Sequence, residues 1–148
     1  MNVTNKRIMA LDYGARTVGV AITDDLIMTA QPAETIRRDS ENKLRRTLAR
    51  IRELAEHNDV GLIVVGLPLN MDDSMGERAR KALEFAEMVK ARTGLPVEMQ
   101  DERLSTVAAQ EVLDEMGVHG REQKQYVDKI AAAYILEDYI NGRQKDNN

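Results

Sequence analysis

The chain contains no cysteine, so it can form neither a disulfide bond nor a thiolate metal site. Aromatic residues make up only 3% of its 148 residues, too few for a platform on which the bases of a single strand could stack. The longest apolar runs, such as residues 62–65, are far shorter than a membrane span, and residues 1–7 contain no apolar signal core. We therefore expect a cytoplasmic protein that is not inserted in a membrane.

Positive charge is not in excess either, because the formal net charge is -4 at pH 7. This balance excludes a uniformly basic nucleic-acid coat, although phosphate contacts depend on local patches rather than on the total. The composition, with 43% apolar and 31% charged residues, is typical of a globular protein with one hydrophobic core. We expect one domain over residues 1–141 and a flexible polar tail over residues 142–148.

The order of apolar patterns predicts a mixed α/β fold. Strand patterns cover residues 7–12, 17–23, 33–37, 62–66 and 97–100. Helical spacing covers residues 41–57, 76–92, 105–116 and 123–141. Short connections between the first three strands indicate an antiparallel meander. The later alternation of helices and strands predicts that the fourth and fifth strands extend parallel from the first, giving a five-stranded sheet with helices on both faces.

Asp12 ends the first apolar strand and is followed at once by Tyr13, Gly14 and the second strand. An acid at the end of a buried strand lies at the rim of the sheet, where binding and catalytic groups of α/β folds usually lie. The alternative is that Asp12 only starts the turn, with Gly14 supplying the permissive backbone angles.

Further acids favour the functional interpretation. Asp101 and Glu102 end the fifth strand, at the edge that Asp12 occupies if the first and last strands are parallel. Asp128 lies in the first turns of the last helix, and its helical neighbours three, four and seven residues on are all apolar. An acid on the packed side of a helix must be paired or metal-bound. The alternatives are an ion-paired loop at 101–103 and a helix-dipole role for Asp128.

Four motifs in this order resemble the YqgF/RuvX family: Leu11-Asp12-Tyr13-Gly14, Val65-Gly66-Leu67-Pro68-Leu69-Asn70, Asp101-Glu102-Arg103-Leu104-Ser105-Thr106 and Val127-Asp128-Lys129-Ile130-Ala131-Ala132. The resemblance covers nearly the whole chain. It implies a ribonuclease H-like fold, a bacterial cytoplasmic location and a nuclease role in ribosome biogenesis, as 5′-end maturation of pre-16S rRNA, or alternatively as a Holliday junction resolvase. It places the acidic site on Asp12, on the pair Asp101 and Glu102, and on Asp128.

We expect these acids to catalyse metal-dependent hydrolysis of a phosphodiester bond at a two-metal site. Carboxylates without histidine or cysteine select Mg²⁺ or Mn²⁺. Asp12 would bridge the ions, Glu102 and Asp128 would hold one each, and Asp101 would be an additional ligand or a neighbour of the ligands. Which of Asp101 and Glu102 turns inward stays open, with Glu102 favoured.

Substrate contacts are expected from cations and small polar groups near the acids: Arg16, Asn70, Arg103, Ser105, Thr106 and Lys129. The expected partners are structured RNA or branched DNA and ribosomal precursor particles, bound by a monomer or weak homodimer.

Residues 120–126 are less basic than in many relatives, so whether they contact nucleic acid stays open. The basic residues between 37 and 52 are interpreted mainly as a solvated face, and loop 69–76 as either a substrate lid or an ordinary connection.

Two other classes of protein remain as alternatives. A phosphotransferase of the actin and sugar-kinase type also pairs a strand-end aspartate with a glycine, but it needs a second domain for which 148 residues leave no room. A catalytically silent nucleic-acid-binding module is the other. Metal-dependent hydrolysis of a phosphodiester bond would distinguish the nuclease from the silent module, and ATP binding would favour the phosphotransferase.

Overall fold

The computed structural model describes residues 6–102 and 105–146. Five strands form one sheet: β1 (Arg7–Tyr13), β2 (Thr17–Thr23), β3 (Ala30–Arg37), β4 (Val60–Leu67) and β5 (Val97–Asp101). Four helices accompany them: α1 (Arg45–His57), α2 (Glu77–Thr93), α3 (Ser105–Glu115) and α4 (Gly120–Asp146). None of the helices in these described ranges is both long and apolar enough to span a membrane.

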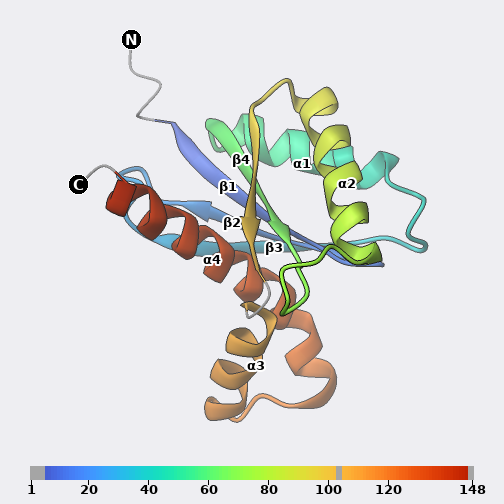
Figure 1. Ribbon diagram of the computed structural model, residues 1–148, viewed down its shortest axis with the longest axis vertical. Coiled ribbons are helices and arrows are strands. Elements are labelled where there is room, and N and C mark those ends of the chain that lie inside the picture. The colour runs from blue at the N-terminus through green and yellow to red at the C-terminus, as the bar shows by residue number, and fades with distance from the viewer. Residues whose placement is uncertain (1–5, 103–104, 147–148) are drawn as a thin grey trace.

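The strands lie in the order β3-β2-β1-β4-β5. The first three pair antiparallel, whereas β4 pairs parallel with β1, and β5 pairs parallel with β4. The mixed sheet predicted from the sequence, a meander extended by parallel strands, is therefore confirmed. Because β1, β3, β4 and β5 all run the same way, their carboxyl ends share one edge of the sheet (Figure 1).

Each face of the sheet carries its own apolar core. Met9 and Leu11 of β1 pack with α1 and α2 through residues such as Ile51 and Phe85. Ile8 and Ala10 of the same strand face the opposite way and pack with Ala132, Ile135, Leu136 and Ile140 of α4. Since side chains alternate along a strand, Asp12 belongs to the α4 face. Figure 1 shows α4 on one side of the strands, at the lower left, and α1 and α2 on the other side, at the upper right.

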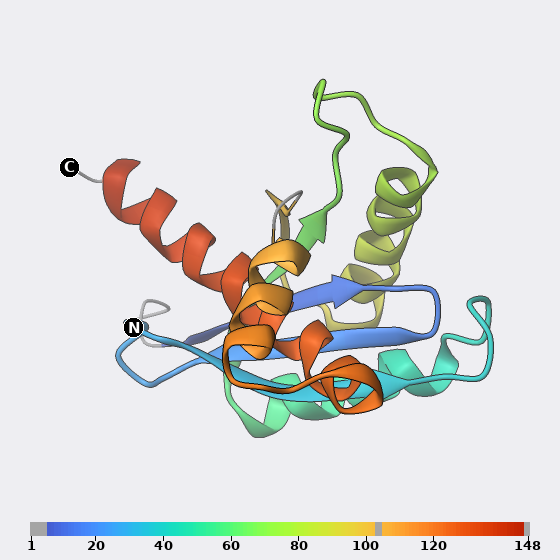
Figure 2. The same cartoon turned by 90° about the horizontal axis from the view of Figure 1, so that it is seen from below.

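Helix α3 and the first turns of α4 project from the carboxyl edge of the sheet. They form a helical hairpin beneath the end of β5 in Figure 1, and they lie nearest the viewer in Figure 2, which looks from below. The chain passes from the end of β5 into this hairpin and returns over the sheet as α4. The hairpin is therefore next to the carboxyl ends of the strands.

Several predicted boundaries were wrong. Strand β3 begins at Ala30 rather than near residue 33, and helix α4 begins at Gly120 rather than near residue 123. Helix α1 begins at Arg45 rather than near residue 41, because Glu41 belongs to an irregular segment in which Arg38 N–H donates to Arg16 O and Lys43 N–H to Ser40 O. Helix α4 continues to Asp146, so residues 142–146 are helical rather than a flexible tail. Ile140 is the last buried residue up to Arg143, where the description of side-chain exposure ends, and the residues after Gly142 include good helix formers that prolong the helix.

Candidate functional site at the carboxyl edge of the sheet

Asp12 and Glu102 meet although ninety residues separate them in the chain. Asp12 is the penultimate residue of β1, and Glu102 directly follows β5. Their carboxyl groups share a hydrogen bond. Glu102 is only 8% exposed, which is unusual for a glutamate. The parallel run of β1, β4 and β5 brings the two acids to one place, as the sequence predicted.

Gly66 makes room for the Glu102 carboxyl group. A Cβ atom at position 66 would lie 2.7 Å from the carboxyl carbon of Glu102 and 2.7 Å from a methyl group of Ile135. The Glu102 backbone N–H also donates to Leu67 O at 3.2 Å, which ties the end of β5 to the end of β4. A larger residue at position 66 would therefore displace the buried acid, so the glycine in this apolar strand shapes the site.

Asp128 reaches the same edge because α4 lies unusually close to β2. A Cβ atom at Gly19 would lie 2.0 Å from the backbone oxygen of Asp128, so only glycine permits this approach. Gly19 is paired with Asp12 in the sheet, which places Asp128 beside Asp12. The Thr17 hydroxyl donates to Asp128 Oδ2 at 2.6 Å and orients the carboxylate.

Burial and mutual repulsion both disfavour ionisation in this cluster. Loss of hydration, followed by the charge of Asp12 and by their shared hydrogen bond, raises the pKa of Glu102 to about 9. Loss of hydration also raises the pKa of Asp12 to about 6, with Asp128 adding repulsion and the hydrogen bond from Glu102 opposing the rise. Burial and the neighbouring charges thus favour a protonated form of the pair, and a bound cation would neutralise it in place of the proton.

The donor set suits a hard divalent cation, since it consists of carboxylate oxygens without histidine or cysteine. As the side chains stand, however, no three acidic or histidine groups in residues 6–102 and 105–146 are close enough together to hold an ion. Asp12 and Glu102 contact one another directly, and Asp128 is held by Thr17. The metal-ligand roles of Asp12, Glu102 and Asp128 stay a prediction.

Asp101 lies beside the cluster rather than inside it. It is the last residue of β5 and is exposed. Loss of hydration raises the pKa of both Glu102 and Asp138 of α4, and the charge of Asp101 adds to this rise. The structure thus places Glu102, and not Asp101, against Asp12. This arrangement agrees with the preference for Glu102 as the inward acid.

The predicted substrate-contacting residues are scattered around this edge. Arg16 is exposed in the turn between β1 and β2, and Lys129 follows Asp128 with its ammonium 5.0 Å from the ring centre of Tyr126. Asn70 is exposed but bonds within its own loop, donating from Nδ2 to Ser74 Oγ at 2.9 Å. Arg103 lies outside the described residues, and Ser105 and Thr106 begin α3. The lid role of loop 69–76 stays untested.

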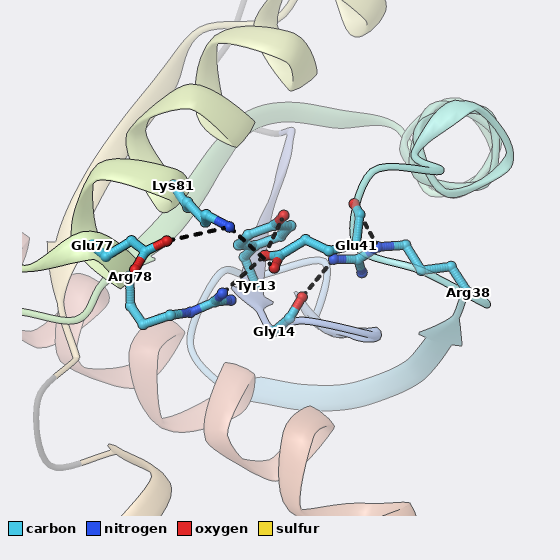
Figure 3. A network of polar contacts seen from close by, with 7 residues as sticks. All are labelled: Tyr13, Gly14, Arg38, Glu41, Glu77, Arg78 and Lys81. Atoms are coloured by element: carbon cyan, nitrogen blue, oxygen red, sulfur yellow. Dashed lines mark hydrogen bonds and ion pairs between the residues drawn. The ribbon is translucent and has the colours of Figure 1, made fainter.

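A polar network on the other face of the sheet holds the residue after Asp12. Tyr13 stacks on Phe85 with ring centres 4.4 Å apart and donates its hydroxyl to Glu41 at 3.0 Å. Glu41 also pairs with Arg78 and Lys81 of α2. Arg38 donates to Gly14 O at 2.6 Å, and Figure 3 shows it reaching the turn after β1. These contacts on the α1/α2 face therefore hold the end of β1 that carries Asp12.

Three residues that shape the site were not among the sequence candidates: Thr17, Gly19 and Gly66. A signal existed for the two glycines, because glycine inside a strand pattern indicates a close approach by other groups. Thr17 gave no comparable signal, since threonine is common at strand starts whatever its neighbours. Its role depends on α4 folding back over β2.

Comparison with known proteins supplies the family. Residues 6–142 match the family model RuvX, described as Holliday junction resolvase. A Lachnospira eligens protein named "Putative pre-16S rRNA nuclease" is 53% identical over 139 residues, covering 94% of this chain and 99% of the relative. A Listeria monocytogenes protein of the same name is 47% identical over 135 residues, covering 91% and 97%.

Solved structures support the same fold. T. thermophilus RuvC in complex with a Holliday junction substrate has a TM-score of 0.58 at 16% identity, covering 94% of this chain and 96% of that one. Fowlpox virus resolvase, solved with Holliday junction DNA, has a TM-score of 0.52 at 14% identity, with 93% and 98% coverage. These likenesses show a RuvC-like, ribonuclease H-like fold. From the family match and the identity to its relatives, the chain belongs to the RuvX (YqgF) family.

Proposed function

We propose that this chain is a divalent-metal-dependent nuclease that hydrolyses phosphodiester bonds during 5′-end processing of pre-16S rRNA in the cytoplasm. The observation that carries the proposal is the meeting of Asp12, Glu102 and Asp128, from three distant segments, at one edge of the sheet. The names of the relatives supply the choice of RNA.

In this proposal Asp12, Glu102 and Asp128 hold the cations, and Asp101 adds negative charge beside Glu102. Bound Mg²⁺ or Mn²⁺ would supply charge neutralisation at the phosphate and activation of the attacking water. Arg16 and Lys129 position the phosphate backbone, because ammonium and guanidinium groups bind phosphate without reading sequence. Asn70, Arg103, Ser105 and Thr106 complete the proposed substrate contacts, in a monomer or weak homodimer.

Resolution of a Holliday junction is the second candidate, favoured by the description of the family model. Parallel cleavage assays on a pre-16S rRNA fragment and on a synthetic four-way junction, each with Mg²⁺ and with Mn²⁺, distinguish the two substrates. We expect cleavage of the RNA at its mature 5′ end. Cleavage confined to the junction would reverse the choice, and binding without hydrolysis would indicate a silent module.

Asp12→Asn tests the site itself. We expect this variant to lose cleavage, on the order of a thousandfold or more, while keeping its fold, because the substitution keeps the side-chain size and removes the charge. Asp59→Asn is the matched control, since Asp59 precedes β4 at the opposite end of the sheet and its exposed carboxylate pairs with Lys6. Full activity of Asp12→Asn would refute the proposed site.

A further inference from the structure

Two hollows adjoin one another near the end of β3, and Arg37 lines both. The first, about 590 Å³, lies between the end of β3 and the start of α4 and is lined by Thr35, Arg37, Arg121, Lys124, Tyr126 and Lys129. The second, about 580 Å³, surrounds the turn from β3 into α1 and is lined by residues 37–39 and 42–46. Both are open at the surface and polar, so they suit an extended ligand more than an enclosed small molecule.

The cations of these hollows lack acidic partners. Arg37, Arg121 and Lys124 form no ion pair with any described residue. Further along α1 the arginines are neutralised, Arg50 by Glu34 at 2.7 Å and Arg52 by Glu56 at 2.9 Å. In a chain with an overall charge of -4, positive charge left unpaired around two adjoining hollows indicates an anionic ligand.

The second hollow repeats this pattern at the start of α1. Lys43, Arg45 and Arg46 are exposed there, and the first turn of the helix holds no acid. Cations at this end oppose the helix dipole, so helix stability does not account for them. The charge is therefore better explained by binding than by folding.

The sheet register connects the first hollow to the acidic cluster. Asp12 is paired with Gly19, and Gly19 with Thr35, so the three residues form one row across β1, β2 and β3. Neighbouring strands are about 4.8 Å apart, which puts the backbone of Thr35 about 10 Å from that of Asp12. Lys129 lines the hollow and directly follows Asp128. The hollow thus begins where the acidic cluster ends.

We propose that Arg37 joins the two hollows into one track for the sugar-phosphate backbone of the substrate strand, leading from Asp128 across the end of β3 to the start of α1. This inference rests on the proposed nuclease function and adds the path of the substrate. Most cations between 37 and 46 then contact phosphate, which revises their interpretation as a solvated face. Contacts of this kind bind the strand without selecting its sequence.

Salt-dependent binding tests the track. Affinities of the wild-type protein and its variants for labelled pre-16S RNA are measured by fluorescence anisotropy with EDTA, which prevents metal-dependent cleavage, at about 50 to 200 mM salt. Two double variants probe the hollows: Arg37→Gln with Lys124→Gln, and Arg45→Gln with Arg46→Gln. The control is Lys90→Gln with Arg92→Gln, which removes exposed charges from the last turn of α2, near the opposite edge of the sheet.

Each hollow variant should weaken binding by on the order of tenfold. The slope of log affinity against log salt should become less steep by about 1 to 2, because each RNA phosphate that the protein no longer contacts keeps about one counterion on binding. The control should bind like the wild-type protein. The substituted side chains are exposed, so thermal midpoints should stay close to the wild-type value.

Wild-type affinity and slope in either hollow variant would overturn the track. In that case, cleavage by the wild-type protein together with loss of cleavage in Asp12→Asn would leave the proposed nuclease function intact. A wild-type protein that neither binds nor cleaves RNA or junction DNA would overturn both proposals. The two failures are therefore distinguishable in one set of measurements.

Discussion

Glu102 is the residue of the site whose ionisation is most strongly disfavoured by its surroundings. Its carboxyl group is nearly enclosed, contacts Asp12 and lies in the field of Asp101. Each of these features favours the protonated form, so the group gains little from folding once it is ionised. A carboxylate that opposes folding when charged, yet stays at the sheet edge, is typical of a functional rather than a stabilising position.

The raised pKa of Glu102 predicts a pH-dependent stability in the absence of metal. Since the folded pKa of about 9 exceeds the ordinary value of about 4.3, the folded chain binds the extra proton. This contribution to the free energy of unfolding is complete below the ordinary value and is lost as the pH rises through about 9.

In EDTA, the melting temperature of the wild-type protein should therefore fall between about pH 5 and pH 9 by several degrees more than that of Glu102→Gln. Asp12, with its smaller rise in pKa, contributes in the same direction and remains in the variant. Parallel curves for the two proteins would show that Glu102 is ionised throughout this range.

At the scale of elements, the contact of α4 with β2 decides whether the acids meet. The backbone of α4 rests on Gly19 at Asp128, and the same helix then packs Ile135 over Gly66. The helix is also held by an apolar core of Ala132, Leu136 and Ile140. Small residues on both surfaces allow the backbones to approach, and the approach carries Asp128 to Asp12.

Two glycine substitutions should change stability in opposite directions. Gly19→Ala places a methyl group against the α4 backbone and should cost roughly 1–3 kcal/mol of unfolding free energy, because neither backbone can easily move away. Gly142→Ala meets no atom within 4 Å and should add about 0.5–1 kcal/mol, since alanine favours the helix. Chemical denaturation measures both, and a neutral Gly19→Ala would mean that α4 does not lie this close.

At the scale of the whole molecule, Glu41 connects three parts that are distant in the sequence. It accepts a hydrogen bond from Tyr13 at the end of β1 and pairs with Arg78 and Lys81 at the start of α2. Figure 3 shows these side chains converging on Glu41 from α2 and from the end of β1. The segment before α1 therefore braces both the strand that carries Asp12 and the helix after loop 69–76.

Glu41→Ala should lower the free energy of unfolding by about 1–3 kcal/mol, because the Tyr13 hydroxyl then loses its partner in a buried environment. Glu77→Ala is the matched control, since Glu77 also pairs with Lys81 but is 76% exposed, and it should change stability by less than about 0.5 kcal/mol. Urea melts compare the two. Equal effects would mean that the network does not brace the fold.

The sequence by itself determined the strands, their parallel or antiparallel order and the candidate acids that meet at the carboxyl edge of the sheet. Apolar periodicity reports which face of an element is buried, and strand-end acids report the functional edge. Only the tertiary structure decided that Glu102 turns inward, that Thr17 orients Asp128 and that Gly19 and Gly66 admit the acids. These contacts join residues from elements far apart in the chain. A glycine in a strand pattern indicates that some group approaches closely, but local sequence patterns do not specify which distant group it is.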